Sequence, residues 1–323
     1  MVLEVKNLAT TFKTSSGSVH AVNNISFTLN KGEILGLVGE SGSGKSVTAL
    51  SIMRLLPEPS GQINSGEVLL NGKNLLKLSE KEMCKIRGNE ISMIYQEPMA
   101  ALNPVFTVGQ QIGEIIKTHE GIKGKYLKQR VIELLQLVQM PNPRESFKKY
   151  PHELSGGRRQ RIMIAMALSC SPKVLVADEP TTALDVTIQA EILDLLKDIS
   201  NKLKTSIIFI THDLDVIAEI ANKVAVMYAG KIVEECSVLE FFDNPYHPYS
   251  KGLMLSRPSN VNENSRLFSI PGMVPSAYDL PLGCSFSQRC SKCIPICLKK
   301  VPKLRDEKDK HKVSCWLYEE NEV

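Results

Sequence analysis

The chain has 323 residues, 43% of them hydrophobic, which suits one large domain or two unequal globular domains. Its formal net charge is only +4 and it has no long basic run, so we expect no nucleic-acid partner. No apolar stretch approaches the roughly 18 residues of a membrane-spanning helix. Because residues 1–10 also lack the apolar core of a signal peptide, we expect a cytosolic location.

Two β-type runs open the chain, at residues 3–12 and 21–29. The segment between them is rich in Ser, Thr and Gly, which predicts a turn between antiparallel strands. Phe12 lies near the end of the first run. It is a candidate to stack on an adenine ring, and packing in the core is the alternative explanation for an aromatic residue there.

Residues 39–46 match the phosphate-binding pattern G-x-x-x-x-G-K-[ST]. An apolar run at 33–38 predicts a buried strand before the pattern, and residues 47–55 predict a helix after it. In this context backbone N–H groups and the helix dipole can hold a phosphate. Lys45 is expected to reach the β- and γ-phosphates, and the Ser46 hydroxyl to hold Mg²⁺. The candidate phosphate-binding residues are Gly39, Ser41, Gly42, Ser43, Gly44, Lys45 and Ser46.

The middle of the chain predicts a helical insertion followed by an α/β region. Residues 101–150 are mostly helical in pattern, because apolar residues recur at helical spacing between charges. After them, strand-like runs alternate with a helical stretch, which predicts a parallel sheet. The strand-like runs are 174–177, 206–210 and 224–228, and the helical stretch is 188–203.

Two carboxylates, Asp178 and Glu179, follow the strand-like run at 174–177. They are expected at the carboxyl edge of the sheet, where nucleotides bind. Asp178 suits Mg²⁺ through a water molecule. Glu179 can then polarise the water that attacks the γ-phosphate.

Ser155-Gly156-Gly157 precedes a helical stretch at 160–168, whose N-terminus can face an anion. In this position, upstream of Asp178, the segment resembles the signature sequence of ATP-binding-cassette ATPases. The signature of one subunit in that family completes the ATP site of another. The resemblance therefore implies a head-to-tail pair, with Ser155 and Gly157 facing the partner's ATP.

Three further segments match the same family in the same order. Gln96 follows a strand-like run at 91–95, where the family has a glutamine that touches Mg²⁺. Ala183-Leu184-Asp185 resembles the D-loop, and His212 stands where the family has a switch histidine that contacts the γ-phosphate. The resemblance assigns Gln96 and His212, with Glu179, to the catalytic group and Asp185 to nucleotide binding.

This resemblance implies the fold. We expect an α/β, ABC-type nucleotide-binding domain over residues 1–256. It would have a P-loop, RecA-like parallel sheet core, an antiparallel β subdomain and an inserted helical subdomain at about residues 101–165. Residues 257–283 are rich in Pro, Ser, Asn and Gly, so residues 257–323 are expected to form a linker and a Cys-rich, metal-binding C-terminal extension.

Three segments indicate a branch of the family. Residues 96–104 resemble the glutamine-loop segment of oligopeptide and dipeptide importer ATPases, and residues 244–253 are similar to their His-Pro-Tyr-Thr segment. The cysteine-rich end resembles that of their D-type subunits. The implied function is ATP hydrolysis that drives import of dipeptides or oligopeptides. Nickel or metallophore, glutathione and other small-solute importers are the near alternative, and a soluble cassette ATPase acting on DNA or ribosomes is the distant one.

Five of the eight cysteines lie between residues 284 and 315, which in a reducing compartment favours metal ligation over disulfides. Four thiolates can hold a [4Fe–4S] cluster or zinc. The resemblance favours a [4Fe–4S] cluster on Cys284, Cys290, Cys297 and Cys315. Zinc is the alternative, and Cys293 is an extra candidate ligand.

The family also implies partners. We expect a second, related ABC ATPase in a heterodimer, two transmembrane permease subunits and an extracytoplasmic solute-binding protein. The chain would then lie peripherally on the cytoplasmic face of the cell membrane. A regulatory or metal-sensing role of the cysteine-rich end could coexist with transport.

Overall fold

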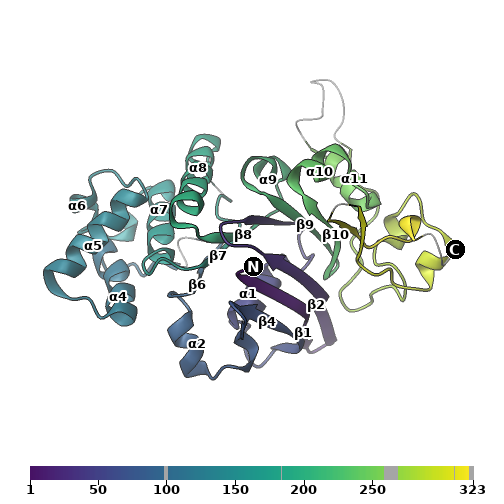
Figure 1. Cartoon of the computed structure of the whole chain (residues 1–323), viewed down its shortest axis with the longest axis horizontal. Helices are drawn as coiled ribbons and strands as arrows, with labels where there is room; N and C mark the ends of the chain where they lie inside the picture. Colours follow the sequence, from purple (N-terminus) through teal and green to yellow (C-terminus); the bar gives the residue numbers. More distant parts are fainter. Residues whose placement is uncertain (98–100, 183, 258–267, 309, 320–323) are drawn as a thin grey trace. The chain divides into compact units, whose positions relative to one another are not determined.

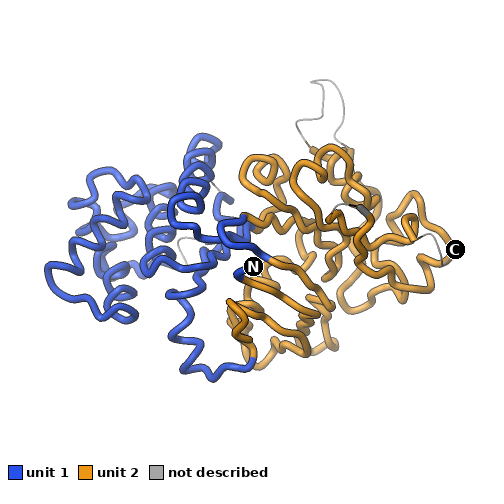
Figure 2. Tube along the Cα trace, in the orientation of Figure 1, with its two compact units in different colours: residues 1–2, 29–33, 77–209 blue, residues 3–28, 34–76, 210–323 orange. Residues whose placement is uncertain are grey.

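The computed structural model describes residues 1–97, 101–182, 184–257, 268–308 and 310–319 (Figure 1). Within these ranges no helix is long and apolar enough to cross a membrane. The chain divides into two compact units (Figure 2). Unit 1 comprises Met1–Val2, Leu29–Glu33 and Lys77–Phe209, and unit 2 comprises Leu3–Thr28, Ile34–Leu76 and Ile210–Val323.

Unit 1 combines short buried strands with most of the described α-helices. Its strands are β6 (Ile91–Ile94), β7 (Val174–Asp178) and β8 (Ser206–Thr211), the last two residues of which belong to unit 2. Its helices include α2 (Glu80–Ile86), α4 (Val108–Glu120), α5 (Gly124–Leu137), α6 (Pro143–Ser146), α7 (Gly156–Ala167), α8 (Val186–Leu203) and the 3-10 helix η2 (Pro151–Glu153). Strand β7 lies between β8 and β6.

Strands β6 and β7 are parallel and paired in register from Ile91 with Val174 to Ile94 with Ala177. Because side chains on both faces of these strands are buried, each reads as a continuous apolar run. Parallel pairing brings the carboxyl ends of β6 and β7 to the same edge. The residues that follow the two strands are therefore neighbours.

The helical part of unit 1 packs through apolar faces. Val108, Ile112 and Ile116 recur every four residues along α4 and are buried, and α4 packs against α5 and α7. Thr107 and Gln110 form a capping box that starts α4. The helical character expected for residues 101–150 is confirmed.

Unit 2 contains an antiparallel sheet in the order β2-β1-β4-β5. Strands β1 and β4 are antiparallel, with a register shift after Lys6. This sheet agrees with the strands expected before the phosphate-binding pattern. Its strands are β1 (Leu3–Thr14), β2 (Gly17–Leu29), β4 (Gly61–Leu70) and β5 (Lys73–Asn74), and the 3-10 helix η1 (Leu75–Lys77) follows them.

A second group of unit 2 strands is ordered β11-β12-β10-β9-β3, with β3 and β9 parallel. The strands are β3 (Ile34–Val38), β9 (Lys223–Tyr228), β10 (Lys231–Ser237), β11 (Arg305–Lys308) and β12 (His311–Val313). The α-helices are α1 (Lys45–Met53), α9 (Leu214–Ile220), α10 (Val238–Asp243) and α11 (Pro248–Leu255). The 3-10 helices η4 (Ser287–Arg289), η5 (Pro295–Leu298) and η6 (Trp316–Tyr318) lie in the cysteine-rich end.

One helix boundary differs clearly from the sequence expectation. Helix α7 begins at Gly156, four residues before the expected start. Two consecutive glycines have low helix propensity, which moved the expected start to residue 160. Tertiary packing outweighs that preference, because the glycine at position 157 lets the first turn of α7 lie close to Ile188.

Candidate active site

The phosphate-binding pattern forms the connection from β3 to α1, as expected. Gly39 and Gly44 have positive φ angles of 151° and 100°. A Cβ on Gly39 would lie 2.2 Å from the Met227 carbonyl oxygen, and one on Gly44 would lie 2.3 Å from the Ala21 carbonyl oxygen. Both positions therefore require glycine, for backbone conformation and for space.

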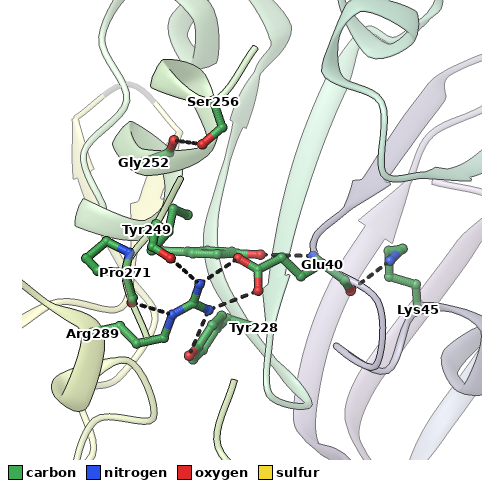
Figure 3. Close-up of polar contacts among 9 residues, drawn as sticks. Glu40, Lys45, Tyr228, Tyr249, Gly252, Ser256, Pro271 and Arg289 are labelled. Carbon is green, nitrogen blue, oxygen red and sulfur yellow. Dashed lines mark hydrogen bonds and ion pairs between the residues drawn. The ribbon is translucent and has the colours of Figure 1, made fainter. Parts of the chain in front are cut away.

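Lys45 is buried at the start of α1. Its Nζ donates a hydrogen bond to the Gly39 carbonyl oxygen at 2.8 Å. It donates another to the Glu40 carbonyl oxygen at 3.1 Å (Figure 3). Ser46 follows it in the first helical turn and is half-buried. Ser41 and Gly42 lie exposed in the turn. The loop thus places its cation and its hydroxyl at one helix N-terminus.

Ser43 is buried, and its hydroxyl has no hydrogen-bond partner among the described residues. Leaving a buried hydroxyl unpaired costs free energy, so such a group usually serves a ligand or a strained segment. Because Ser43 lies inside the phosphate-binding loop, its hydroxyl is suited to donate a hydrogen bond to a phosphate oxygen.

Phe12 is half-buried in β1. Its cross-strand partner is Gly61, and a Cβ at that glycine would lie 3.0 Å from the phenylalanine ring. The ring therefore packs on the β4 backbone and is half-buried. This packing agrees with a structural role for Phe12, and the stacking of Phe12 on adenine stays a prediction.

Gln96 and Glu179 meet at the carboxyl ends of β6 and β7. The Gln96 side-chain amide donates to Glu179 Oε2 at 2.9 Å, and the Thr182 hydroxyl donates to the same oxygen at 3.0 Å. Glu179 has a positive φ of 47°, which is uncommon outside glycine. Asp178, the last residue of β7, is buried beside it.

The sequence alone did not identify Thr182 as a functional residue. Its contact with Glu179 depends on the turn after β7, and a threonine three residues after a carboxylate gives no recognisable pattern. Two donors on one oxygen fix the orientation of the Glu179 carboxylate. That arrangement suits a group that must direct a water molecule.

Ser155 is the exposed N-cap residue of α7, and its side chain makes no capping hydrogen bond. Gly157 has no room for a side chain, because a Cβ there would lie 2.6 Å from Ile188 Cγ2. Asp185 caps α8 by accepting a hydrogen bond from the Ile188 N–H at 3.0 Å. The signature and Asp185 thus meet around the start of α8.

His212 and the segments around residues 98–100 and 183 complete the expected positions. His212 is the exposed residue directly after β8. Ala183 of the D-loop segment and residues 98–100 of the glutamine-loop segment fall outside the described residues.

The four favoured cysteines of the C-terminal end affect one another electrostatically. Burial raises the pKa of Cys315 to about 12, with smaller contributions from Cys284, Cys290 and Cys297. Burial likewise raises the pKa of Cys284 to about 11, with contributions from Cys297 and Cys290. The Cys284 N–H also donates to the Cys297 carbonyl oxygen at 2.7 Å. Cys293 is exposed.

A different donor group is the most closely gathered among the described residues. Potential ligand atoms of Glu234, Cys236 and His311 all lie within 4.8 Å of one another, and all three residues are buried. Glu234 already accepts hydrogen bonds from the Tyr246 and His247 N–H groups and contacts His311 Nε2 at 2.6 Å. The contact between Glu234 and His311 therefore connects strand β10 to strand β12.

His311 lies 77 residues from Glu234, and no sequence pattern connects two residues so far apart. The His311 ring stacks on Tyr246, with ring centroids 3.9 Å apart. Burial opposes ionisation of Glu234, but the hydrogen bonds from His311 and from the Tyr246 and His247 N–H groups lower its pKa. Glu234 therefore remains ionised and anchors the C-terminal strand.

Comparisons with known proteins agree over nearly the whole chain. A family model described as "ABC transporter" matches residues 22–182, and one described as "Oligopeptide/dipeptide transporter, C-terminal region" matches residues 233–297. The chain is 50% identical to the oligopeptide transport ATP-binding protein AppD of Bacillus subtilis, over 99% of this chain and 97% of that protein. It is 52% identical to OppD of the same organism, over 98% and 88%.

Solved structures share the fold. A dimeric structure of MJ0796, titled a bacterial ABC transporter cassette, aligns with a TM-score of 0.65 and 27% identity, over 73% of this chain and 98% of that one. The same cassette in a post-hydrolysis state bound to ADP and Pi aligns with a TM-score of 0.66 and 27% identity, over the same shares of both chains.

Proposed function

The chain belongs to the ABC transporter family of ATP-hydrolysing cassettes, and on that premise we propose that it powers the import of dipeptides or oligopeptides. The observation that carries the cargo class is the match of residues 233–297 to the C-terminal region of oligopeptide and dipeptide transporters. Relatives named for oligopeptide and dipeptide transport share about half of its residues over nearly its full length. Import of nickel, glutathione or other small solutes gains no such support.

In unit 2, the residues of the phosphate-binding loop are proposed to bind ATP. Lys45 would contact the β- and γ-phosphates, and Ser43 and the loop N–H groups would donate to phosphate oxygens. Phe12 would stack on the adenine ring, and His212 would contact the γ-phosphate. The unpaired, buried Ser43 hydroxyl and the two obligatory glycines support this assignment.

In unit 1, Glu179 is proposed to orient and polarise the attacking water. Gln96 and Thr182 hold its carboxylate, which supports a directional role. Gln96 and, through water, Asp178 are the Mg²⁺ ligands proposed in this unit, and Ser46 is the Mg²⁺ ligand proposed in unit 2. The ion would neutralise charge on the phosphates when bound.

The signature supports a paired arrangement of subunits. The Ser155 hydroxyl makes no cap with its own helix, which leaves it suited to another subunit's nucleotide. We therefore propose that Ser155, Gly157 and Asp185 act across a head-to-tail ATPase heterodimer. Two permeases and an extracytoplasmic binding protein would complete the importer, with this chain peripheral on the cytoplasmic face of the membrane.

Residues 1–256 are proposed to form the ATPase domain, with a helical subdomain at about 101–165, and residues 257–323 the linker and cysteine-rich extension. We propose a [4Fe–4S] cluster on Cys284, Cys290, Cys297 and Cys315. Tetrahedral zinc on the same four thiolates is the alternative, since four cysteine thiolates accept either group.

The cargo is tested with the complete importer reconstituted in vesicles that contain ATP. The expected result is ATP-dependent uptake of a labelled oligopeptide, with no comparable uptake of Ni²⁺ or glutathione. Uptake of Ni²⁺ or glutathione in preference to peptide would overturn the peptide proposal while leaving the ATPase assignment intact.

The tail is tested on anaerobically purified protein by absorption spectroscopy and by iron, sulfide and zinc analysis. In wild type we expect iron, sulfide and a broad absorption at about 400 nm. Cys284→Ser and Cys315→Ser should each lose them. Cys293→Ser is the matched control and should retain the absorption, because Cys293 is exposed. Stoichiometric zinc, or no metal, would refute the cluster.

A further inference from the structure

Arg289 of the C-terminal end contacts the phosphate-binding loop, 249 positions away in the chain (Figure 3). Its Nη1 donates to Glu40 Oε2 at 2.9 Å, and its Nη2 donates to Glu40 Oε1 at 3.2 Å. Such a two-point pairing fixes both charge and orientation. Glu40 is the second residue of the loop, and Arg289 closes the short helix η4. Both residues belong to unit 2.

The remaining contacts of Arg289 hold the guanidinium in one place. Its Nε donates to the Pro271 carbonyl oxygen at 3.1 Å, and its Nη2 also donates to the Ile270 carbonyl oxygen at 3.2 Å. Nη1 lies 3.4 Å from the Tyr228 hydroxyl. The Arg289 side chain is 5% exposed and that of Glu40 29%, so the cation of this pair is shielded from solvent more than in a surface ion pair. Together these contacts hold the Arg289 guanidinium group in one position.

Glu40 is held from its backbone as well. Its N–H donates to the Tyr249 hydroxyl at 2.9 Å, and its carbonyl oxygen accepts the hydrogen bond from Lys45 Nζ. Any shift of Glu40 therefore moves an acceptor of the loop lysine. In addition, a Glu40 carboxylate without its cation would place an uncompensated negative charge in a loop built to bind phosphate.

The cysteine-rich end determines where Arg289 lies. Backbone hydrogen bonds run from the Cys284 N–H to Cys297, from the Ser287 N–H to Cys284 and from the Arg289 N–H to Phe286. Arg289 is therefore presented by the same turns that present Cys284 and Cys290. The position of the guanidinium follows the conformation of this segment.

We propose that Arg289 is a positioning residue of the phosphate-binding loop, which neutralises and orients Glu40 and so makes ATP affinity depend on the cysteine-rich end. The inference rests on the proposed binding of ATP by this loop. In this role Arg289 contacts neither ATP nor the reacting atoms. It acts through Glu40.

The test is calorimetric titration of the full-length protein with Mg²⁺ and the non-hydrolysable analogue AMP-PNP. The variants are Arg289→Gln, Arg289→Lys, Glu40→Gln and the double variant. Arg257→Gln is the matched control, because Arg257 forms a comparable ion pair with Asp215, with Nε donating to Oδ1 at 2.9 Å, and neither residue belongs to the loop. Thermal unfolding is measured on the same samples.

We expect Arg289→Gln to weaken AMP-PNP binding about tenfold, which corresponds to about 1.4 kcal/mol. Arg289→Lys should be intermediate, because it keeps the charge and loses the two-point geometry. In the Glu40→Gln background, Arg289→Gln should change affinity by less than about twofold. Arg257→Gln should bind like wild type even if its melting temperature falls.

Each contrary result has a distinct meaning. Wild-type affinity in Arg289→Gln, equal losses in Arg289→Gln and Arg257→Gln, or an undiminished tenfold loss in the Glu40→Gln background would each overturn the positioning role. Failure of the wild-type protein itself to bind AMP-PNP would instead overturn the proposed ATP-binding function.

Discussion

The phosphate-binding loop and the Glu179 carboxylate are supported in opposite ways. The loop depends on partners distant in sequence, because its glycines lie against Ala21 and Met227 and its Glu40 contacts Tyr249 and Arg289. Glu179 is held by Thr182, three residues on, and by Gln96 at the end of the neighbouring strand. One region is shaped by the surrounding fold, and the other by two adjacent strand ends.

This difference in support corresponds to a difference in the proposed roles of the two regions. A phosphate-binding loop must present several backbone N–H groups at once, so the whole loop must be shaped in advance. A group that directs water needs one side chain at one angle, which two hydrogen bonds can provide. Changes at the loop should therefore affect stability and binding together, whereas changes around Glu179 should affect turnover.

The largest effect is expected from Gly44→Ala. The positive φ and the carbonyl oxygen of Ala21, at 2.3 Å from the new Cβ, should together cost about 3 to 5 kcal/mol of unfolding free energy and abolish measurable ATP binding. Gly42→Ala is the control inside the same loop, because its φ is also positive but a Cβ there meets nothing within 4 Å. Chemical denaturation with ATP titration measures both. Equal losses in the two variants would show that space at position 44 is unimportant.

A smaller effect should appear as a pH dependence of stability at His247. Burial lowers the pKa of His247 to about 4, and the neutral ring accepts the Tyr249 N–H on Nδ1 at the start of α11. The unfolded chain protonates this histidine near pH 6.5, so its contribution is present above pH 6.5 and is lost as pH falls toward 4. Over this pH range the free energy of unfolding should fall by about 3 kcal/mol.

His247→Asn keeps a capping side chain and removes the titration. Urea denaturation from pH 7 to pH 4.5 should give a flatter loss of stability in this variant than in wild type. His20→Asn, which alters an exposed histidine, should follow the wild-type curve. Parallel curves for His247→Asn and wild type would contradict a buried neutral histidine.

The smallest effect is expected at Thr182. Thr182→Val removes one of two donors to Glu179, which should lower kcat about threefold with ATP affinity unchanged, since one such hydrogen bond contributes about 1 kcal/mol or less. Thr187→Val alters an exposed threonine in the first turn of α8 and serves as the control. Steady-state ATP hydrolysis measures both. A change in ATP affinity instead of kcat would place Thr182 in binding.

The sequence predicted the family and the main features of the fold, because the chemistry of phosphate binding restricts residue types at fixed spacing. Comparison with known proteins confirms the cassette fold and the membership in the peptide-transporter branch. Buried strands such as β7 were also visible, since strands covered on both faces form continuous apolar runs.

The supporting contacts could not be predicted in this way. Arg289 and Glu40, or His311 and Glu234, are joined only by tertiary folding, and an arginine beside a cysteine carries no pattern that points to a loop 249 positions away. The early start of α7 was missed for a related reason. Its two glycines oppose helix formation locally, and the close approach of Ile188 explains the glycine at position 157.

The most direct test of these two roles compares Glu179→Gln with wild type for binding and hydrolysis of Mg²⁺-ATP in the same preparations of the full-length protein. We predict that ATP affinity changes by less than about twofold while the rate of hydrolysis falls about a thousandfold, because the loop is proposed to bind ATP and the carboxylate to direct water. Hydrolysis within tenfold of wild type, or a parallel loss of binding, would contradict this division of roles between the two regions.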